Sequence, residues 1–386
     1  MTDRDSYWMS RALEFAACGQ GCVEPNPMVG CVVVEDDEMF SSGYHRFFGG
    51  PHAEVEALER CDPNRLSKST LYVTLEPCSH FGKTPPCVDL ILQHPPKRVV
   101  IAMQDPFPEV AGRGIQKLRD HSIEVPVGVM EQQANELNAP YLKLLKTGMP
   151  WVVAKWAMTL DGAIATHDHD SKWISNEQSL GVVHQLRSGM DAIIIGIGTA
   201  LADNPLLTTR LASGLSPART ATRVIMDRSC RLSPESNLVQ SINAGPILVA
   251  ASDQADQARV LALRDAGCEV YLIPEQEVSR SLKYTLLEFG KRRYTNVLLE
   301  GGGTLLGHAF DQDLIDQVHC FIAPKIVGGM GAIRPIAGSG KSLMSEARQL
   351  NKMTVECLGD NVHIQGIVKC ASSPQIGRSV ERCPLR

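Results

Sequence analysis

The first half of the chain alternates apolar runs with segments of helical periodicity. Apolar residues recur at roughly helical spacing from residue 6 to 17, which predicts an opening helix. Short β-rich runs predict strands at residues 31–34, 70–75, 98–102 and 123–127. Further helices are expected near residues 51–58, 88–93, 114–120 and 131–146. This alternation of strands and helices predicts a layered α/β fold.

A second α/β pattern begins at Trp151, after a Gly- and Pro-containing linker at residues 147–150. It predicts a helix at residues 176–188 and strands at residues 152–157, 192–196, 223–226, 247–250, 269–272 and 296–300. We therefore expect two domains, residues 1–147 and 151–370. The polar stretch 371–386 is expected to be a disordered tail.

Composition narrows the class of protein. The chain has 386 residues, of which 44% are hydrophobic and 21% charged, as in ordinary globular domains. Its formal net charge of -5, with no block of Lys and Arg, argues against a nucleic-acid partner. No apolar signal sequence or membrane span is visible, so no membrane partner and a cytoplasmic location are expected. The 12 cysteines are then expected to be free thiols or metal ligands.

Four residues of the first domain form a pattern typical of a catalytic metal site. His52, Cys78 and Cys87 offer three zinc ligands, which leaves the fourth tetrahedral position for water. Glu54 lies two residues after His52 and is a candidate proton carrier, as in the zinc deaminases. Eight residues separate the two cysteines, so the usual Cys-x-x-Cys half of the deaminase motif is absent.

The long inter-cysteine loop resembles one deaminase family. The run from Glu76 to His80, followed by Thr84-Pro85-Pro86-Cys87, is similar to the bifunctional riboflavin-biosynthesis deaminase/reductases. The resemblance implies a cytidine-deaminase-like three-layer domain that binds Zn²⁺ and deaminates a pyrimidine ribosyl phosphate. It assigns Glu54 to catalysis and substrate binding to a further set of residues: Asn26, His45, His80, Lys83 and Thr84.

The second domain resembles the reductase half of the same family, which has a dihydrofolate-reductase-like α/β fold. The matching stretches are residues 155–162, 171–175, 187, 196–210, 300–307, 323–325 and 328–329. The resemblance implies NADPH as hydride donor and Lys155 as the catalytic group. Cofactor binding would fall to Ala157, Trp173, Thr199, Asp203, Gly302, Gly303, Thr304, Leu305, Leu306, Gly307 and His308. Substrate binding would fall to Ser171, Arg187, Leu207, Arg210 and Glu300.

Some of these assignments have plain structural alternatives. The glycine run after residue 300 does not fit the dinucleotide fingerprint well and could serve tight packing instead. Lys155 could be an ordinary strand lysine. The family usually has glycine where His169 stands, arginine where Leu180 stands, and serine or threonine where Arg228 stands. Arg228 could pair with the extra phosphate of NADPH or be solvated.

The sequence thus predicts a bifunctional enzyme that deaminates a diamino-ribosylaminopyrimidinone phosphate with zinc-activated hydroxide and then reduces its ribosyl group to ribityl. The family resemblance also implies a homo-oligomer. Three alternatives stay open at this point: a nucleoside or RNA deaminase, a deaminase whose reductase half has lost activity, and a non-catalytic zinc scaffold.

Overall fold

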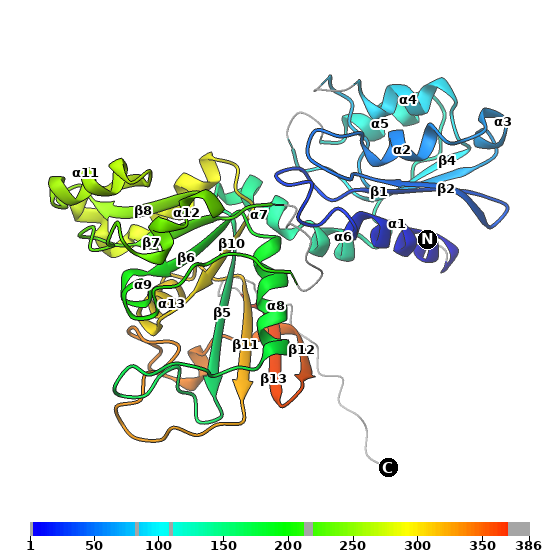
Figure 1. Cartoon of the computed structure of the whole chain (residues 1–386). Helices are drawn as coiled ribbons and strands as arrows, with labels where there is room; N and C mark the ends of the chain where they lie inside the picture. Colours follow the sequence, from blue (N-terminus) through cyan, green and yellow to red (C-terminus); the bar gives the residue numbers. More distant parts are fainter. Residues whose placement is uncertain (1–2, 82–84, 108–110, 212–218, 370–386) are drawn as a thin grey trace, which may run out of the picture. The chain divides into compact units, whose positions relative to one another are not determined.

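The computed structural model describes residues 3–81, 85–107, 111–211 and 219–369 (Figure 1). Lys83, Thr84 and the expected tail 371–386 therefore lie outside the described residues. The chain divides into two compact units, residues 1–151 with 181–298, and residues 152–180 with 299–386. The domain ranges expected from the sequence stay a prediction. Among the described helices, none is both long enough and apolar enough to cross a bilayer.

A four-stranded sheet forms the centre of the N-terminal region, in the order β2-β1-β3-β4 (Figure 1). Its strands are β1 (Gly30–Glu35), β2 (Glu38–Tyr44), β3 (Thr70–Leu75) and β4 (Arg98–Met103). Strand β1 pairs antiparallel with β2 and β3, and β3 pairs parallel with β4. Both faces are apolar, since Val33 packs in one buried cluster and its neighbour Val32 in another.

Helices cover both faces of this sheet (Figure 1). One cluster joins the sheet to α2 (Ala53–Leu58), α4 (Cys87–Gln93) and α5 (Arg113–Asp120). The other joins it to α1 (Asp3–Ala17), α6 (Glu131–Leu137) and α7 (Ala139–Thr147). The short α3 (Pro63–Leu66) precedes β3. The expected three-layer α/β arrangement is confirmed.

Two predicted elements of this region are wrong in detail. The single helix expected at residues 131–146 is broken at Asn138, whose side chain accepts from Met28 N–H at 2.8 Å and donates to Met28 C=O at 3.0 Å. Pro140, in the first turn of α7, marks the new start. The strand expected at 123–127 is reduced to two isolated bridges to β4, since Pro126 has no N–H for a ladder.

A nine-stranded sheet occupies the C-terminal region, in the order β12-β13-β11-β5-β10-β6-β7-β8-β9. The strands that the sequence predicts are recovered as β5 (Trp151–Thr159), β6 (Ala192–Gly196), β7 (Thr222–Met226), β8 (Ile247–Ser252), β9 (Glu269–Ile273) and β10 (Asn296–Glu300). Strands β6 to β9 pair in parallel, as βαβ units require.

The remaining strands, β11 (Gln317–Ala323), β12 (Leu350–Leu358) and β13 (Asn361–Val368), were not predicted from the sequence. The main helices between strands are α8 (Glu177–Ser188), α9 (Ile197–Asp203), α11 (Gln257–Asp265), α12 (Ser281–Lys291) and α13 (Gly303–Asp311). Shorter pieces are α10 (Asn237–Gln240) and three 3₁₀ turns, Ile242–Ala244, Glu275–Arg280 and Met344–Glu346.

A buried histidine pair links three of these strands. His319 Nδ1 lies 3.0 Å from His363 Nε2, and His363 Nδ1 lies 2.6 Å from a Glu356 carboxylate oxygen. Because the carboxylate accepts, His363 carries a proton on Nδ1. Burial, and then the neighbouring His363, lower the pKa of His319 to about 4.

We expect this pair to make stability depend on pH. An unfolded histidine has a pKa near 6.5, so between pH 6.5 and about 4 the unfolded chain binds a proton that native His319 does not. The contribution is complete above pH 6.5 and is lost as the pH falls, by roughly 2 kcal/mol at pH 5. Urea unfolding at pH 7 and pH 5 should show a smaller pH dependence in His319→Gln than in the wild type. If the unfolding free energies of the wild type and His319→Gln changed equally between pH 7 and pH 5, the lowered pKa of His319 would be contradicted.

Candidate functional site

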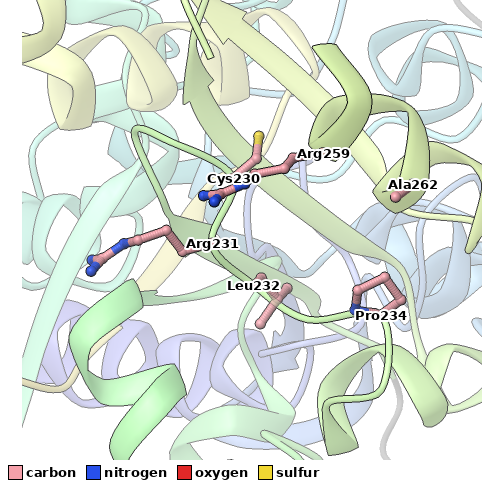
Figure 2. A pocket seen from close by; sticks show the side chains of 6 residues that line it. All are labelled: Cys230, Arg231, Leu232, Pro234, Arg259 and Ala262. Atoms are coloured by element: carbon pink, nitrogen blue, oxygen red, sulfur yellow. The ribbon is translucent and has the colours of Figure 1, made fainter. Parts of the chain in front are cut away.

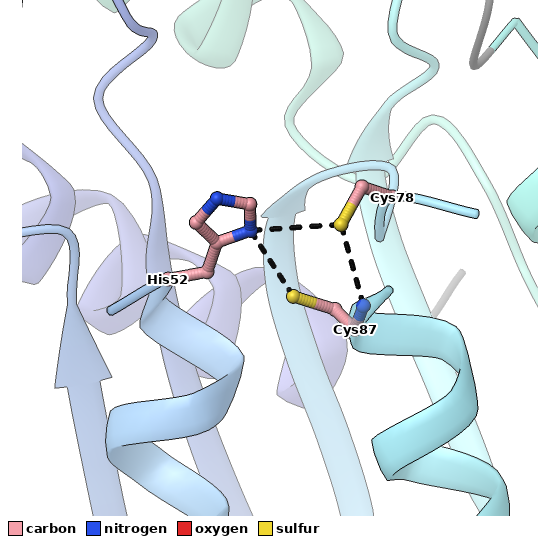
Figure 3. A group of neighbouring side chains, drawn as sticks. All are labelled: His52, Cys78 and Cys87. Carbon is pink, nitrogen blue, oxygen red and sulfur yellow. Dashed lines mark hydrogen bonds between the residues drawn. The ribbon is translucent and has the colours of Figure 1, made fainter. Parts of the chain in front are cut away.

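Three potential ligand side chains converge in the N-terminal region (Figure 3). His52 is the N-cap of α2, Cys87 is the first residue of α4, and Cys78 lies in the loop that follows β3. His52 Nδ1 lies 3.2 Å from Cys87 Sγ and 3.6 Å from Cys78 Sγ, and all three ligand atoms lie within 4.8 Å of one another. The structure therefore brings together the three ligands that the spacing predicted.

The protonation of these groups matches the chemistry of a divalent cation site. A hydrogen bond from Cys87 is the main cause that lowers the pKa of Cys78 to about 4, so Cys78 is a thiolate. The pKa of Cys87 is raised by its contact with Cys78 and by its burial. The contact with Cys78 also raises the pKa of His52 to about 9. A metal ion would replace these shared protons, because thiolates and neutral imidazole are its ligands.

Glu54 stands beside this cluster without belonging to it. It lies in the first turn of α2, two residues after His52, and is only 3% exposed. Burial raises its pKa above the ordinary value for a glutamate. A carboxyl group in such surroundings takes up and releases a proton more readily near neutral pH than an exposed one does.

Two further predicted residues are joined beside the cluster. His45 Nδ1 lies 2.9 Å from the Pro51 carbonyl oxygen, so Nδ1 carries the proton and Nε2 accepts. Asn26 Nδ2 then donates to that Nε2 at 3.4 Å. Burial lowers the pKa of His45, which keeps the ring neutral, and it meets His52 edge-on at 5.7 Å between centroids. A fixed, neutral imidazole and an oriented amide thus lie next to the cluster.

His80 also lies in this part of the chain, on the loop after Cys78. Its ring centroid is 6.3 Å from that of Phe107. Its Nδ1 is buried and has no hydrogen-bond partner among the described residues. Buried polar atoms normally have a partner, so this atom fits a role in contacting a ligand.

Glu76 also lies beside this site, although the motif that begins with it indicated no role of its own. In the structure the side chain is 3% exposed and accepts hydrogen bonds from the backbone at the start of α5. The available signal was a charged residue placed directly after the buried strand β3 and two residues before a ligand.

The second unit, residues 152–180 with 299–386, holds the predicted catalytic lysine. Lys155 Nζ on β5 lies 3.7 Å from a carboxylate oxygen of Glu300, and both side chains are largely buried. Ala157 lies two residues along the same strand and is half-buried, as is Ser171. Trp173 is 71% exposed, and its carbonyl oxygen accepts from Lys325 Nζ. A buried Lys–Glu pair is thus present where the sequence predicted the reacting group.

The glycine run after Glu300 serves close packing and begins a helix. A Cβ on Gly303 would lie 2.3 Å from the Arg334 carbonyl oxygen, and one on Gly307 would lie 2.1 Å from that of Ala337. Close packing therefore explains these two glycines. Gly302 is the N-cap of α13 and makes no side-chain cap. A helix N-terminus directly after a sheet strand favours an anionic group, which fits the phosphates of a nicotinamide cofactor.

The first unit holds the other predicted reductase residues. Thr199 and Asp203 lie on α9, and Arg187 on α8 donates to the Thr208 carbonyl oxygen at 3.0 Å. Arg210 N–H donates to His184 Nδ1 at 3.3 Å, so the loop after α9 is tied to α8 at two points. Leu207, directly before Thr208 on this loop, is buried at φ +51°.

The three departures from the family pattern have distinct surroundings. His169 is exposed at φ +65°, a conformation that glycine adopts more easily. Leu180 is a half-buried residue of α8. Arg228 forms an ion pair with Glu275.

A pocket of about 360 Å³ lies elsewhere in the first unit (Figure 2). Its lining is Cys230, Arg231, Leu232, Pro234, Arg259 and Ala262. Burial raises the pKa of the Cys230 thiol to about 11, so this cysteine is protonated and unreactive. None of the predicted site residues lines this pocket.

Comparisons with known proteins match both halves of the chain. A family model described as "Cytidine and deoxycytidylate deaminase zinc-binding region" matches residues 2–103, and one described as "RibD C-terminal domain" matches residues 150–364. The riboflavin biosynthesis protein RibD of Actinobacillus pleuropneumoniae is 38% identical over 95% of this chain and 96% of its own length.

Solved structures agree over nearly the full length. RibD of Acinetobacter baumannii has a TM-score of 0.83 at 34% identity, covering 95% of this chain and 99% of its own. The diaminohydroxyphosphoribosylaminopyrimidine deaminase/5-amino-6-(5-phosphoribosylamino)uracil reductase of Thermotoga maritima has a TM-score of 0.80 at 35% identity, with the same coverage. These likenesses confirm the predicted fold class, a deaminase-like domain followed by a reductase domain.

The likeness extends over both predicted activities. The chain carries a zinc-binding deaminase region, in which His52, Cys78 and Cys87 cluster, and a reductase domain that implies a nicotinamide cofactor. Together with the full-length relatives, these features show that the chain belongs to the family of bifunctional riboflavin-biosynthesis deaminase/reductases, RibD.

Proposed function

We propose that the N-terminal domain hydrolyses the amino group of 2,5-diamino-6-ribosylamino-pyrimidinone phosphate, and that the C-terminal domain then reduces the ribosyl group to ribityl with NADPH. The observation that carries the proposal is the convergence of three zinc ligands beside the buried Glu54. The substrates correspond to the names of the two activities of the Thermotoga maritima relative.

In the deamination, water replaces the amino group as a ring carbonyl and ammonia leaves. Zinc, when bound by His52, Cys78 and Cys87, would lower the pKa of a bound water so that it ionises near neutral pH. Glu54 takes up the proton of the attacking water and passes it to the departing amine. Its burial suits both steps, because a raised pKa brings the proton affinity of the carboxyl group closer to neutral pH.

The substrate would be held by side chains around the cluster. Neutral His45 and the Asn26 amide present fixed polar groups, and the buried Nδ1 of His80 offers a further hydrogen bond. Lys83 and Thr84 complete the proposed set and would contact the ribose phosphate. Their place in the sequence, between the two cysteine ligands, supports this assignment.

In the reduction, a bound nicotinamide cofactor would supply a hydride to the sugar carbon, and a proton would complete the ribityl group. Lys155, paired with Glu300, is the group that handles charge or the proton at the reacting carbon. Arg187, Arg210, Ser171, Leu207 and Glu300 would bind the substrate, the two guanidinium groups gripping its phosphate.

The cofactor would be NADPH, held by Ala157, Trp173, Thr199, Asp203 and the N-terminal part of α13 at residues 302–308. The helix N-terminus after β10 supports the α13 assignment. Arg228 would meet the extra phosphate only by exchanging its partner Glu275. The proposed compartment is the cytoplasm, which the free cysteines among the described residues support.

We also propose that the chain forms a homo-oligomer through the outer face of β12. This strand ends the nine-stranded sheet, and its side chains are mostly exposed. Met353 and Val355, which are 57% and 56% exposed, belong to it. Exposed apolar side chains on an edge strand invite association, and a second copy of the chain offers the same surface for a two-fold contact.

Replacing Glu54 tests the deaminase half. Glu54→Gln keeps the shape but cannot take up the proton, so ammonia release should fall at least about hundredfold. NADPH oxidation on the deaminated substrate should be unchanged. The matched control is Glu59→Gln at the C-cap of the same helix, where the side chain is exposed and should not affect deamination. Loss of both activities in folded Glu54→Gln protein would contradict independent sites.

Replacing Lys155 tests the reductase half and should leave the deaminase half active. Lys155→Met keeps most of the side-chain volume but removes the charge, so kcat of NADPH oxidation should fall at least about tenfold while ammonia release is retained. Single-turnover absorbance at 340 nm with purified deaminated substrate measures the hydride step directly. Normal reduction by this variant would show that Lys155 is an ordinary strand lysine.

Charge on β12 tests the oligomer. Val355→Lys should convert the wild-type assembly into monomer in sedimentation velocity, because a lysine cannot be buried without a partner. Thr354→Lys, its exposed neighbour on the opposite face of the strand, should leave the mass unchanged. A wild-type protein that sediments as a monomer would refute self-association, and an unaffected Val355→Lys assembly would refute this interface.

A further inference from the structure

We propose that Glu76 is a positioning residue of the metal centre. Its buried carboxylate fastens the backbone just before Cys78 to the start of α5 and so holds the Cys78 thiolate where His52 and Cys87 converge. Glu76 would act through Cys78 and not by binding the metal or the substrate. This inference rests on the proposed zinc-dependent function.

The carboxylate of Glu76 collects four backbone N–H groups. Oε1 accepts from Gly114 at 2.9 Å and from Ile115 at 3.2 Å. Oε2 accepts from Gly112 at 2.9 Å and from Asp105 at 3.3 Å. Three of the four donors belong to the cap and first turn of α5, where helical N–H groups have no partner within the helix. The partial positive charge at the N-terminus of α5 also favours a negatively charged side chain there.

The backbone around Glu76 is fixed on both sides. Glu76 N–H donates to the Met103 carbonyl oxygen at 3.0 Å, which ties it to the end of β4. The Cys78 carbonyl oxygen accepts from Val88 N–H at 3.2 Å, and Cys87 N–H lies 3.3 Å from Cys78 Sγ. The short segment that carries the Cys78 ligand is thus held at α5 by Glu76 and at α4 by its own carbonyl and sulfur.

Gly114 shows how closely this segment approaches α5. A Cβ at this position would lie 2.2 Å from the Pro77 carbonyl oxygen, so only glycine fits. The carboxylate and the glycine therefore act on the same contact, one by hydrogen bonds and the other by leaving space. An apolar side chain in place of Glu76 could not make these hydrogen bonds, and any side chain in place of Gly114 would collide with the backbone.

Only a carboxylate satisfies this arrangement. Two ionised oxygens offer about four acceptor sites, which matches the four N–H groups. A glutamine has one acceptor oxygen and would turn an NH₂ group toward two N–H donors. The isosteric Glu76→Gln change should therefore loosen the contact between residues 76–78 and α5. Changes to residues that orient a metal ligand typically reduce metal affinity about 10–100-fold, and we expect a loss in that range.

The test compares Glu76→Gln with Glu124→Gln in the full chain. Glu124 lies in the same domain and pairs with Arg98 at the surface, so it controls for the loss of one negative charge. Zinc affinity is measured by competition with a chromophoric chelator, and ligand geometry by the charge-transfer and d–d bands of the cobalt-substituted protein. Reduction of the deaminated substrate reports whether the rest of the chain is intact.

We expect Glu76→Gln to bind zinc about 10–100-fold more weakly and to alter the cobalt spectrum, while reduction and the Glu124→Gln control stay at wild-type levels. Wild-type zinc affinity and an unchanged spectrum would overturn the inference while leaving the proposed deamination intact. A wild type that binds zinc but releases no ammonia would instead refute the proposed function.

A measurement on the wild type covers the case in which the variant does not fold. If Glu76 couples α5 to the metal centre, then zinc must stabilise that contact in return. Removing zinc should therefore speed hydrogen–deuterium exchange at the amides of Gly112, Gly114 and Ile115, but not in strand β6. Exchange at these three amides that is insensitive to zinc would contradict the inference.

Discussion

The N-terminal site depends on one constraint, which is that two thiols and an imidazole must be held within 4.8 Å of one another. Two helix starts and the loop after one strand meet this constraint, since His52 caps α2, Cys87 begins α4 and Cys78 follows β3. Without a cation these groups share protons, with Cys78 as thiolate beside His52. The buried faces of the four-stranded sheet fix the elements, and the Glu76 contact fixes the loop between them.

The second half of the chain meets a different requirement. A reductase must hold the nicotinamide of its cofactor against the sugar carbon that receives the hydride, and the cofactor itself supplies most of the chemistry. The second unit carries the buried Lys155–Glu300 pair, which we propose as its reacting group, and the start of α13, which we propose binds cofactor phosphate. Consecutive reactions in one chain then need no shared catalytic residue, because each domain brings its own chemistry.

Much of this could be predicted from the sequence, because the signals are local. The His52-x-Glu54 pair and the two cysteines carry their chemistry in their spacing, and the apolar runs of β6 and β10 fall at the expected residues. The glycines at 303 and 307 are explained by backbone contacts with residues 334 and 337, which the sequence does not reveal. The Glu76 contact joins residues 29 to 39 positions apart and is equally invisible.

The missed strands have a physical explanation. Strand β11 buries His319, and β13 buries Asn361 and His363, so polar residues interrupt the alternation that marks a strand. Strand β12 is exposed along most of its length, so its apolar residues do not mark a buried face. The break at Asn138 was missed for a similar reason, because its partner Met28 is 110 residues away.

We propose that one chain performs zinc-dependent deamination and then reduction at separate sites. The most direct measurement follows ammonia release and NADPH oxidation together, on the diamino-ribosylaminopyrimidinone phosphate, before and after zinc is removed with a chelator. We expect ammonia release to precede NADPH oxidation in the zinc-loaded protein. We also expect zinc removal to stop deamination but to leave reduction of added deaminated substrate intact. Ammonia release that persists without zinc, or reduction that fails with zinc bound, would contradict this proposal.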